Sequence, residues 1–415
     1  MVMVMSGAQA FAGDWSARAE RRQGRLVDLL CELIALPSEN PPGNEGQLAE
    51  FLGQYVARSG AEVRLQEVLP DRPNLLATWR FGPGDAEDSG PVLALVSHLD
   101  VVPAPPGSGL FKPEIRDGRV WGRGACDAKG SLAAMVVAAE CLLEATDLVG
   151  GTLVLAALMG EETGGLGARA LVASGFRADA AIIGEPTDLT LVTAHRGKAI
   201  RRVTFRGRAA HAAQAFLGQN AVVAAARFIS LLAESEGQVP EGTGPRLPRR
   251  TQITPTVIQG GLEFNVVPAE CRVDLDCRLA LDTQLTDLER LLNDTAQVAA
   301  RPWPGMMVRV ETVGKDRNPV DLGADHPLVH WAREVLARHG GSLELGSCYP
   351  AATDQGVLLE DGNPTFALGP GALADAHTDE ESVAVVDLVR AVAIFAALAH
   401  DAFSGTAPPK AARRG

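Results

Sequence analysis

Acidic and imidazole side chains follow four short apolar runs of this sequence, at the point where each run ends. The runs are VLALVS, TLVLAALMG, AAIIG and TFALGPG, and the polar residues after them are His98, Asp100, Glu161, Glu162, Glu185 and His377. In open α/β sheets, ligands bind outside the carboxyl ends of the strands, where residues from distant parts of a sequence converge. Carboxylates and imidazoles that meet in this way would build a metal site.

His98 and Asp100 stand two residues apart after the first run. This spacing fits a neutral imidazole ligand whose ring is oriented by a nearby carboxylate, an arrangement common at metal-binding histidines. A surface turn is the alternative interpretation of so short a motif.

Asp127 lies in the glycine-rich segment WGRGACDAKG, immediately ahead of an apolar helical segment, 131–145. Glycines permit unusual backbone angles and close approach, and a carboxylate placed there could bridge two cations with its two oxygens. An ordinary helix N-cap is the alternative.

Glu161 and Glu162 stand where a nearly all-apolar strand opens into the flexible segment TGGLG. One of them could bind metal while the other, unligated and partly desolvated, has its pKa raised toward the range of a general base. A solvated acidic turn is the alternative. Together with Glu185 and His377, these residues suit two divalent ions such as zinc, cobalt or manganese. Two such ions polarise a carbonyl and lower the pKa of a shared water, which is the chemistry of amide hydrolysis.

The elements that must position these residues alternate between strand and helix from about residue 20 to 198. This alternation predicts βαβ units in an α/β fold, with a largely parallel sheet and helices on both faces. The helical segment 131–145 is apolar over most of its surface, which predicts that it is buried.

Between 199 and 314 the pattern changes to strand, helix, strand, strand, helix, strand, the βαββαβ order of a ferredoxin-like unit. The first pattern then returns with a helix in PLVHWAREVLARHG, the strand NPTFALGPG and a closing helix. We therefore expect a discontinuous catalytic, metal-binding domain, 20–198 and 315–405, with an inserted domain, 199–314. The Gly- and Pro-rich segment 236–250 should be a mobile loop, and 406–415 a flexible tail.

Size and composition describe a globular protein of about two domains: 415 residues, 46% hydrophobic and 21% charged. A net charge of −13 argues against a nucleic-acid partner. Six cysteines without CxxC spacing predict reduced thiols in the cytoplasm. We expect neither a signal peptide in the first 13 residues nor a membrane span, because no apolar run reaches about 18 residues.

Five motifs in order, SHLDVV, GRGACDAKG, MGEETGG, IIGEPTD and AHTDEES, resemble those of the dinuclear zinc exopeptidase and deacylase family. That family includes acetylornithine deacetylase, succinyl-diaminopimelate desuccinylase, carboxypeptidase G and the aminoacylases. The resemblance runs from about residue 33 to 400. It implies that His98 and Glu185 hold one metal, that Glu162 and His377 hold the other, and that Asp127 bridges them.

By the same resemblance Glu161 is the general base, Asp100 orients His98, and the peptide after Asp127 is often cis. The inserted domain would close over substrate as a lid and form a homodimer. In that dimer His211, in GRAAHAAQAFLGQNA, would reach the partner subunit's site and donate a hydrogen bond to the oxyanion. The segment departs from the family pattern at Ala212 and Ala215, where serine and proline are usual.

Three further residues match substrate contacts of the family: Asn265, Arg278 and Thr353. An arginine suits bidentate capture of a carboxylate, so Arg278 implies a free α-carboxylate on the substrate, although a structural role is the alternative. Thr353 and Asp354 resemble a segment that approaches the site. In HTDEE, Glu380 stands where aspartate or asparagine is commoner, and GSGLFKP lacks the usual tryptophan and proline.

The leading hypothesis is a metal-dependent amidohydrolase that removes the acyl group from an N-acyl amino acid, with zinc as the first choice of metal. The motif GEPTD, with Glu185, favours the acetylornithine and diaminopimelate deacylases. An exopeptidase or dipeptidase that cleaves short peptides by the same chemistry is the nearest alternative. A non-catalytic dimeric scaffold is the third, but its sign would be a missing ligand or base, and every one is present.

Overall fold

The structure is a computed structural model that describes residues 14–82, 90–235, 250–339, 344–346, 348–405 and 408. The first 13 residues, the loop expected at 236–250 except its last residue, and all of the expected tail except residue 408 lie outside the described residues. The chain divides into two compact units. Unit 1 comprises Met1–Thr193, Leu322–Gly346 and Thr353–Gly415, and unit 2 comprises Ala194–Asp321 and Ser347–Ala352.

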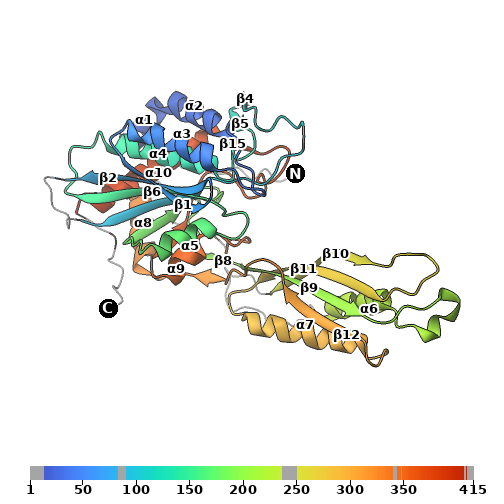
Figure 1. Ribbon diagram of the computed structural model, residues 1–415. Helices are drawn as coiled ribbons and strands as arrows, with labels where there is room; N and C mark the ends of the chain where they lie inside the picture. Colours follow the sequence, from blue (N-terminus) through green and yellow to red (C-terminus); the bar gives the residue numbers. More distant parts are fainter. Residues whose placement is uncertain are drawn as a thin grey trace, which may run out of the picture. The chain divides into compact units, whose positions relative to one another are not determined.

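A six-stranded sheet in the order β1-β2-β6-β3-β7-β14 forms the centre of unit 1 (Figure 1). Its strands are β1 (Glu62–Leu69), β2 (Arg72–Phe81), β3 (Val92–His98), β6 (Gly151–Leu158), β7 (Ala180–Ile183) and β14 (Thr365–Ala367). Neighbours from β6 to β14 are parallel, whereas β2 runs antiparallel to both β6 and β1. A tight turn between β1 and β2 permits only antiparallel pairing, so this hairpin sits at one end of a mostly parallel sheet. The predicted fold class is confirmed.

Helices cover both faces of this sheet, with α3, α4 and α10 on one face and α5 and α9 on the other (Figure 1). The helices of unit 1 are α1 (Asp14–Arg21), α2 (Gln23–Ile34), α3 (Gly46–Ala57), α4 (Lys129–Leu142), α5 (Leu166–Ala173), α8 (Pro327–Arg338), α9 (Gln355–Glu360) and α10 (Val385–Phe403). Every residue of α4 except Glu140 is buried, as its all-round apolar surface predicts. Among the described helices, none has the length and apolarity needed to cross a bilayer.

Two small sheets lie apart from the six-stranded sheet. One has three strands in the order β15-β5-β4, namely β4 (Glu114–Arg116), β5 (Arg119–Trp121) and β15 (Ser382–Ala384). The other pairs β8 (Ala194–His195) with β13 (Val320–Asp321). The three-stranded sheet matters for the site described below. The loop 122–127 begins directly after β5, and the loop 377–381 ends directly before β15.

Unit 2 has the βαββαβ order expected of a ferredoxin-like domain. Its elements are β9 (Gly197–Arg206), a 3-10 helix η1 (Ala212–Leu217), α6 (Ala221–Ser235), β10 (Gln252–Gly260), β11 (Glu270–Leu279), α7 (Leu285–Ala300) and β12 (Met307–Thr312). The sheet order is β10-β11-β9-β12, with all pairs antiparallel. Burial alternates along β9 and β11 because one face packs against α6 and α7 and the other is open.

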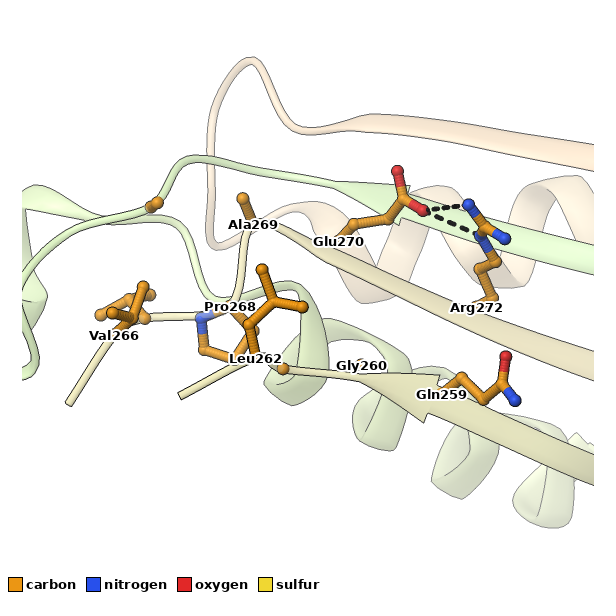
Figure 2. A pocket seen from close by; sticks show the side chains of 11 residues that line it. Gln259, Gly260, Leu262, Val266, Pro268, Ala269, Glu270 and Arg272 are labelled. Carbon is orange, nitrogen blue, oxygen red and sulfur yellow. Dashed lines mark hydrogen bonds and ion pairs between the residues drawn. The ribbon is translucent and has the colours of Figure 1, made fainter. Parts of the chain in front are cut away.

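A hollow of about 430 Å³ lies on unit 2 beside the end of β10 and the start of β11 (Figure 2). Leu262, Val266 and Pro268 form its apolar part, and the ion pair of Glu270 with Arg272 lies at its charged side. None of its lining residues is among the residues for which the sequence predicts a chemical role.

Candidate metal centre

Three neighbouring parallel strands end at one edge of the unit 1 sheet, and predicted site residues lie at each of these ends. His98 is the last residue of β3, Glu161 and Glu162 follow β6, and Glu185 follows β7. Because β6, β3 and β7 are adjacent and parallel, their carboxyl ends meet at the same edge.

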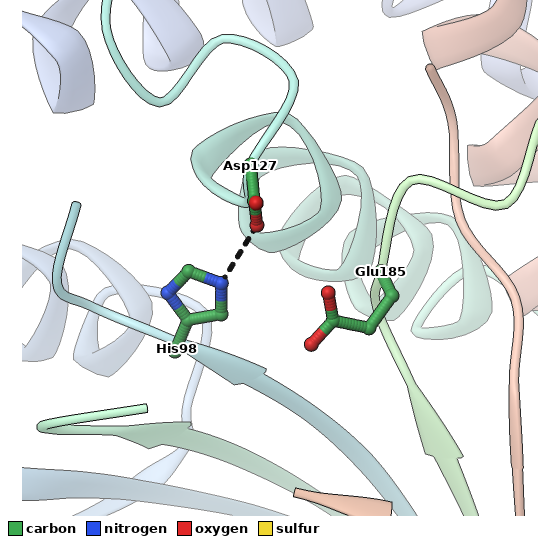
Figure 3. A group of neighbouring side chains, drawn as sticks. All are labelled: His98, Asp127 and Glu185. Atoms are coloured by element: carbon green, nitrogen blue, oxygen red, sulfur yellow. Dashed lines mark hydrogen bonds and ion pairs between the residues drawn. The ribbon is translucent and has the colours of Figure 1, made fainter. Parts of the chain in front are cut away.

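Two groups of side chains at this edge have the composition of a cation site, and Asp127 belongs to both. The first group is His98, Asp127 and Glu185, and the second is Asp127, Glu162 and His377. Within each group the possible donor atoms lie within 4.8 Å of one another. Figure 3 shows the first group, with His98 at the end of its strand, Asp127 at the start of α4 and Glu185 on the loop after β7.

The ring of His98 is held in one tautomer by the main chain. Its Nδ1 lies 2.8 Å from the main-chain oxygen of Asp100, and a carbonyl oxygen can only accept, so Nδ1 carries the proton. The other nitrogen, Nε2, lies 2.9 Å from Asp127 Oδ1: it donates to this carboxylate while the ring is charged, and it has a free lone pair once that proton is lost. A histidine prepared in this way is suited to bind a cation through Nε2.

The carboxylate of Asp100 positions the turn after β6. It accepts hydrogen bonds from the backbone N–H groups of Glu161 at 3.0 Å and Glu162 at 3.1 Å, and from the amide of Asn40 at 2.8 Å. Asp100 Oδ1 lies 3.6 Å from His98 Nδ1, whereas the main-chain oxygen of Asp100 lies 2.8 Å from the same nitrogen. Asp100 therefore contacts His98 through its backbone and the two adjacent glutamates through its side chain.

Asp127 and His377 face each other across the second group. His377 Nε2 lies 3.2 Å from Asp127 Oδ2 and 3.0 Å from Glu162 Oε1. Burial alone would raise the pKa of Asp127, but hydrogen bonds from His377 and His98 outweigh it and hold that pKa below its usual range. The same two contacts with Asp127 and Glu162 raise the pKa of His377 to about 10.

Burial also raises the pKa of Glu162 to about 7 and that of Glu185 well above its usual value. The neighbouring charges of Asp127 and Glu161 add to both shifts. Buried carboxylates that repel one another are favourable only if a proton or a cation compensates their charge. With two imidazoles beside them, the donor set fits divalent cations of the zinc, cobalt or manganese kind.

His211 and Asn265 lie next to each other on unit 2. The N–H of Ala212 donates to the main-chain oxygen of Asn265 at 2.9 Å, and both His211 and Asn265 are exposed. His211 caps η1, since its Nδ1 accepts the N–H of Ala213 at 3.1 Å. In the neutral ring the proton must then be on Nε2, which points a donor away from the cap.

The two remaining predicted contacts have local partners. Arg278, on β11, forms a bidentate pair with Asp276, Nε to Oδ1 at 2.7 Å and Nη2 to Oδ2 at 3.2 Å. Thr353 is buried in unit 1, and its Oγ1 accepts the N–H of Gln355 at the start of α9.

Residue patterns did not identify three buried polar residues of this region, Asn40, Arg123 and Glu381. Asn40 bonds Asp100 and Thr163, whereas Arg123 pairs with Glu381 beside the Asp127 loop. Of the three, Glu381 had a signal in the sequence: it is the second glutamate of HTDEE, a charged residue directly ahead of the apolar run SVAVV. Asn40 stands in a proline-rich segment with no comparable signal.

Residues 94–401 match the model of Peptidase family M20/M25/M40. Acetylornithine deacetylase of Myxococcus xanthus is 31% identical over 89% of this chain and 96% of its own length. A probable carboxypeptidase of Aspergillus clavatus is 30% identical over 92% of this chain and 83% of its own length.

Solved structures share the fold at lower identity. Aminopeptidase PepT of Bacillus cereus aligns with a TM-score of 0.75 at 24% identity, over 91% of this chain and 97% of its own. A tripeptidase of Staphylococcus aureus aligns with a TM-score of 0.76 at 22% identity, over 93% and 98% of the two chains.

Proposed function

Because this chain belongs to Peptidase family M20/M25/M40 and is a metallohydrolase of the deacylase and peptidase type, we propose that it removes the acyl group from an N-acyl amino acid. The observation that carries the proposal is the position of Asp127 in both ligand groups. A carboxylate shared by two groups of donors is what a two-cation hydrolase requires, since each oxygen can serve one cation.

The residues that would hold the cations follow from the two groups. His98 and Glu185 would hold one, Glu162 and His377 the other, with Asp127 between them. We propose zinc, with cobalt and manganese as the alternatives. When bound, two such cations polarise the acyl carbonyl and lower the pKa of a shared water.

Glu161 is the proposed general base. It lies beside Glu162 on the turn that Asp100 holds, it is only partly buried, and it belongs to neither ligand group. It would take the proton that the attacking water loses as the new C–O bond forms. It would then give this proton to the nitrogen as the C–N bond breaks, so the products are a carboxylic acid and a free amine, and the acid then loses its proton to the amine or to solvent.

His211, Asn265, Arg278 and Thr353 are the proposed contacts to substrate. The Nε2–H of His211 would donate to the oxyanion, since its Nδ1 is occupied by the cap. Arg278 uses Nε and Nη2 for Asp276, which leaves Nη1 for the substrate carboxylate.

A homodimer through unit 2 is part of this proposal. Three large apolar side chains of unit 2 are almost fully exposed: Leu262 at 97%, Phe264 at 96% and Phe216 at 81%. They belong to two segments that the Ala212–Asn265 hydrogen bond joins. Large exposed apolar side chains are typical of a protein interface, and one of these two segments begins directly after His211.

An exopeptidase is the second candidate, and the 30% identity to a probable carboxypeptidase favours it. A single panel distinguishes the two. Zinc- and cobalt-loaded protein is assayed with N-acetyl, N-succinyl, N-formyl and N-carbamoyl amino acids and with dipeptides. We expect the highest kcat/KM for an acyl amino acid, whereas a preference for dipeptides would establish the second candidate.

The base is tested by Glu161→Gln, which keeps the shape of the side chain but cannot take a proton. We expect kcat to fall by about 10²–10⁴-fold, with both cations still bound by elemental analysis. Glu162→Gln is the matched control, because it should lower the metal content as well. A Glu161→Gln variant with undiminished kcat would falsify the assignment.

A further inference from the structure

Glu381 is a buried carboxylate that binds the backbone of the loop carrying Asp127. It is 1% exposed. Its Oε1 accepts three backbone N–H groups, from Gly124 at 2.9 Å, Cys126 at 3.1 Å and Asp127 at 3.0 Å. Three donors converging on one charged oxygen determine where this loop can lie, because each hydrogen bond has a narrow range of distance and angle.

The other oxygen of Glu381 pairs with Arg123, which is also buried. Arg123 Nη1 donates to Glu381 Oε2 at 2.6 Å and to the main-chain oxygen of Thr378 at 3.1 Å. The N–H of Gly122 donates in addition to the main-chain oxygen of Glu381 at 3.0 Å. The loop 122–127 and the loop 377–381 are therefore joined at several points, although they are about 250 residues apart in the chain.

Each of the two loops carries a proposed ligand of the second cation, Asp127 on one and His377 on the other. The distance from His377 Nε2 to Asp127 Oδ2 is 3.2 Å. Glu381 is not itself a candidate ligand, since one oxygen is occupied by three N–H groups and the other by the guanidinium. It is also absent from both ligand groups.

We propose that Glu381, paired with Arg123, is a positioning residue that fixes the separation of Asp127 and His377 and so determines the affinity for the cation that these two residues share. The proposal rests on the two-cation site of the proposed function. Partners that orient metal ligands typically contribute 10- to 100-fold to metal affinity.

The test measures cation affinity directly, by calorimetric titration of metal-free protein with zinc and with cobalt. In Glu381→Gln the amide oxygen can still accept the three backbone N–H groups, but the amide nitrogen would face the guanidinium of Arg123, donor against donor. We expect one of the two binding steps to lose about 10- to 100-fold in affinity, while the other step, to which His377 does not contribute, changes less. The absorption spectrum of the cobalt form should change for that one step.

Arg123→Lys and Arg123→Met form a second pair. In Arg123→Lys the ammonium group still pairs with Glu381, so this variant should retain most of the cation affinity of wild type. Arg123→Met should lose as much cation affinity as Glu381→Gln. This difference distinguishes positioning from a merely structural role and keeps the test valid if Glu381→Gln does not fold.

Asp316→Asn is the matched control in unit 2. Asp316 forms a bidentate pair with the buried Arg201, at 2.6 and 2.8 Å, away from any proposed ligand in the sequence. This variant should lower thermal stability without changing either binding step. Equal affinities in wild type, Glu381→Gln and Arg123→Met would overturn the proposal, whereas a wild type that binds a single cation would overturn the proposed function on which it rests.

Discussion

At the scale of single residues, hydrogen bonds decide what each titratable side chain of the site can do. The main-chain oxygen of Asp100 holds the proton of His98 on Nδ1, and the backbone of Ala213 leaves that of His211 on Nε2. The first ring is prepared to accept a cation and the second to donate to an anion. Their local contacts thus prepare two residues of the same type for the opposite roles that we propose for them.

Cation binding should release protons from the metal-free protein. Burial lowers the pKa of His98, but the nearby carboxylates of Asp100 and Asp127 raise it well above 6.5, and the pKa of His377 is raised to about 10. His377 therefore carries a second ring proton at pH 7, the raised pKa of His98 favours the same charged form, and each ring must lose its Nε2 proton to bind a cation through that atom. The apparent affinity should rise with pH up to about 10.

Calorimetric titration in two buffers of different ionisation enthalpy counts the released protons. His377→Gln should release one proton fewer than wild type. Heats that do not depend on the buffer would show that the rings are already neutral.

His211→Ala should lower kcat by about 10²–10³-fold, the usual cost of one oxyanion donor, with unchanged metal content. Removing the cap of η1 should cost about 0.5–2 kcal/mol of unfolding free energy at most. His326→Ala is a close control, because His326 Nδ1 caps α8 in the same way, accepting the N–H of Leu328 at 3.1 Å. If both variants lose activity equally, the effect of His211 comes from capping and not from catalysis.

At the scale of elements, the start of α4 is packed against the loop that carries Asp127. A Cβ placed on Gly130 would lie 2.4 Å from the main-chain oxygen of Ala125. Backbone atoms cannot move aside as a flexible side chain can, so the helix can approach this closely only with glycine at that position. The position of Asp127 therefore depends on the packing of a helix as well as on Glu381.

Gly130→Ala should destabilise the protein by about 1–3 kcal/mol and weaken the binding of both cations, since Asp127 belongs to both groups. Chemical unfolding of the metal-free protein and calorimetric titration measure the two effects. Gly24→Ala in α2 is the control, because a Cβ there meets nothing within 4 Å. It should leave metal binding unchanged and stabilise the protein by up to about 1 kcal/mol.

At the scale of the whole molecule, the exposed side chains Phe216, Leu262 and Phe264 of unit 2 bear on assembly. Phe264→Asp should convert the proposed dimer to a monomer, because a buried unpaired charge opposes association. Light scattering after gel filtration measures the mass. If His211 acts on the partner subunit, kcat should fall when the dimer is lost. Met307→Asp is the control, since Met307 is 65% exposed but lies on β12, at the opposite edge of the sheet from β10.

A Phe264→Asp variant that stays dimeric would place the interface elsewhere. A wild-type monomer with full activity would remove the role of His211 in a partner subunit.

The sequence by itself determined the mostly parallel sheet, the βαββαβ unit and the family, because these depend on local periodicity and on motifs of adjacent residues. Apolar runs such as VLALVS predict strands, and a polar residue after a run predicts a side chain at the sheet edge. His98, Glu162 and Glu185 could be named as candidates on this basis. The cis peptide after Asp127, which the family resemblance implies, is present in the structure.

Only the tertiary structure decided how these residues are connected. The order β6-β3-β7, the antiparallel hairpin of β1 and β2, and the return of segment 347–352 to unit 2 through the pairing of Tyr349 with His195 depend on contacts between distant parts of the chain. The same is true of the backbone contact between Asp100 and His98 and of the hydrogen bonds of Glu381. The physical reason is that a hydrogen bond requires two groups within about 3 Å of each other, and for groups about 250 residues apart only the packing of the whole unit brings them that close.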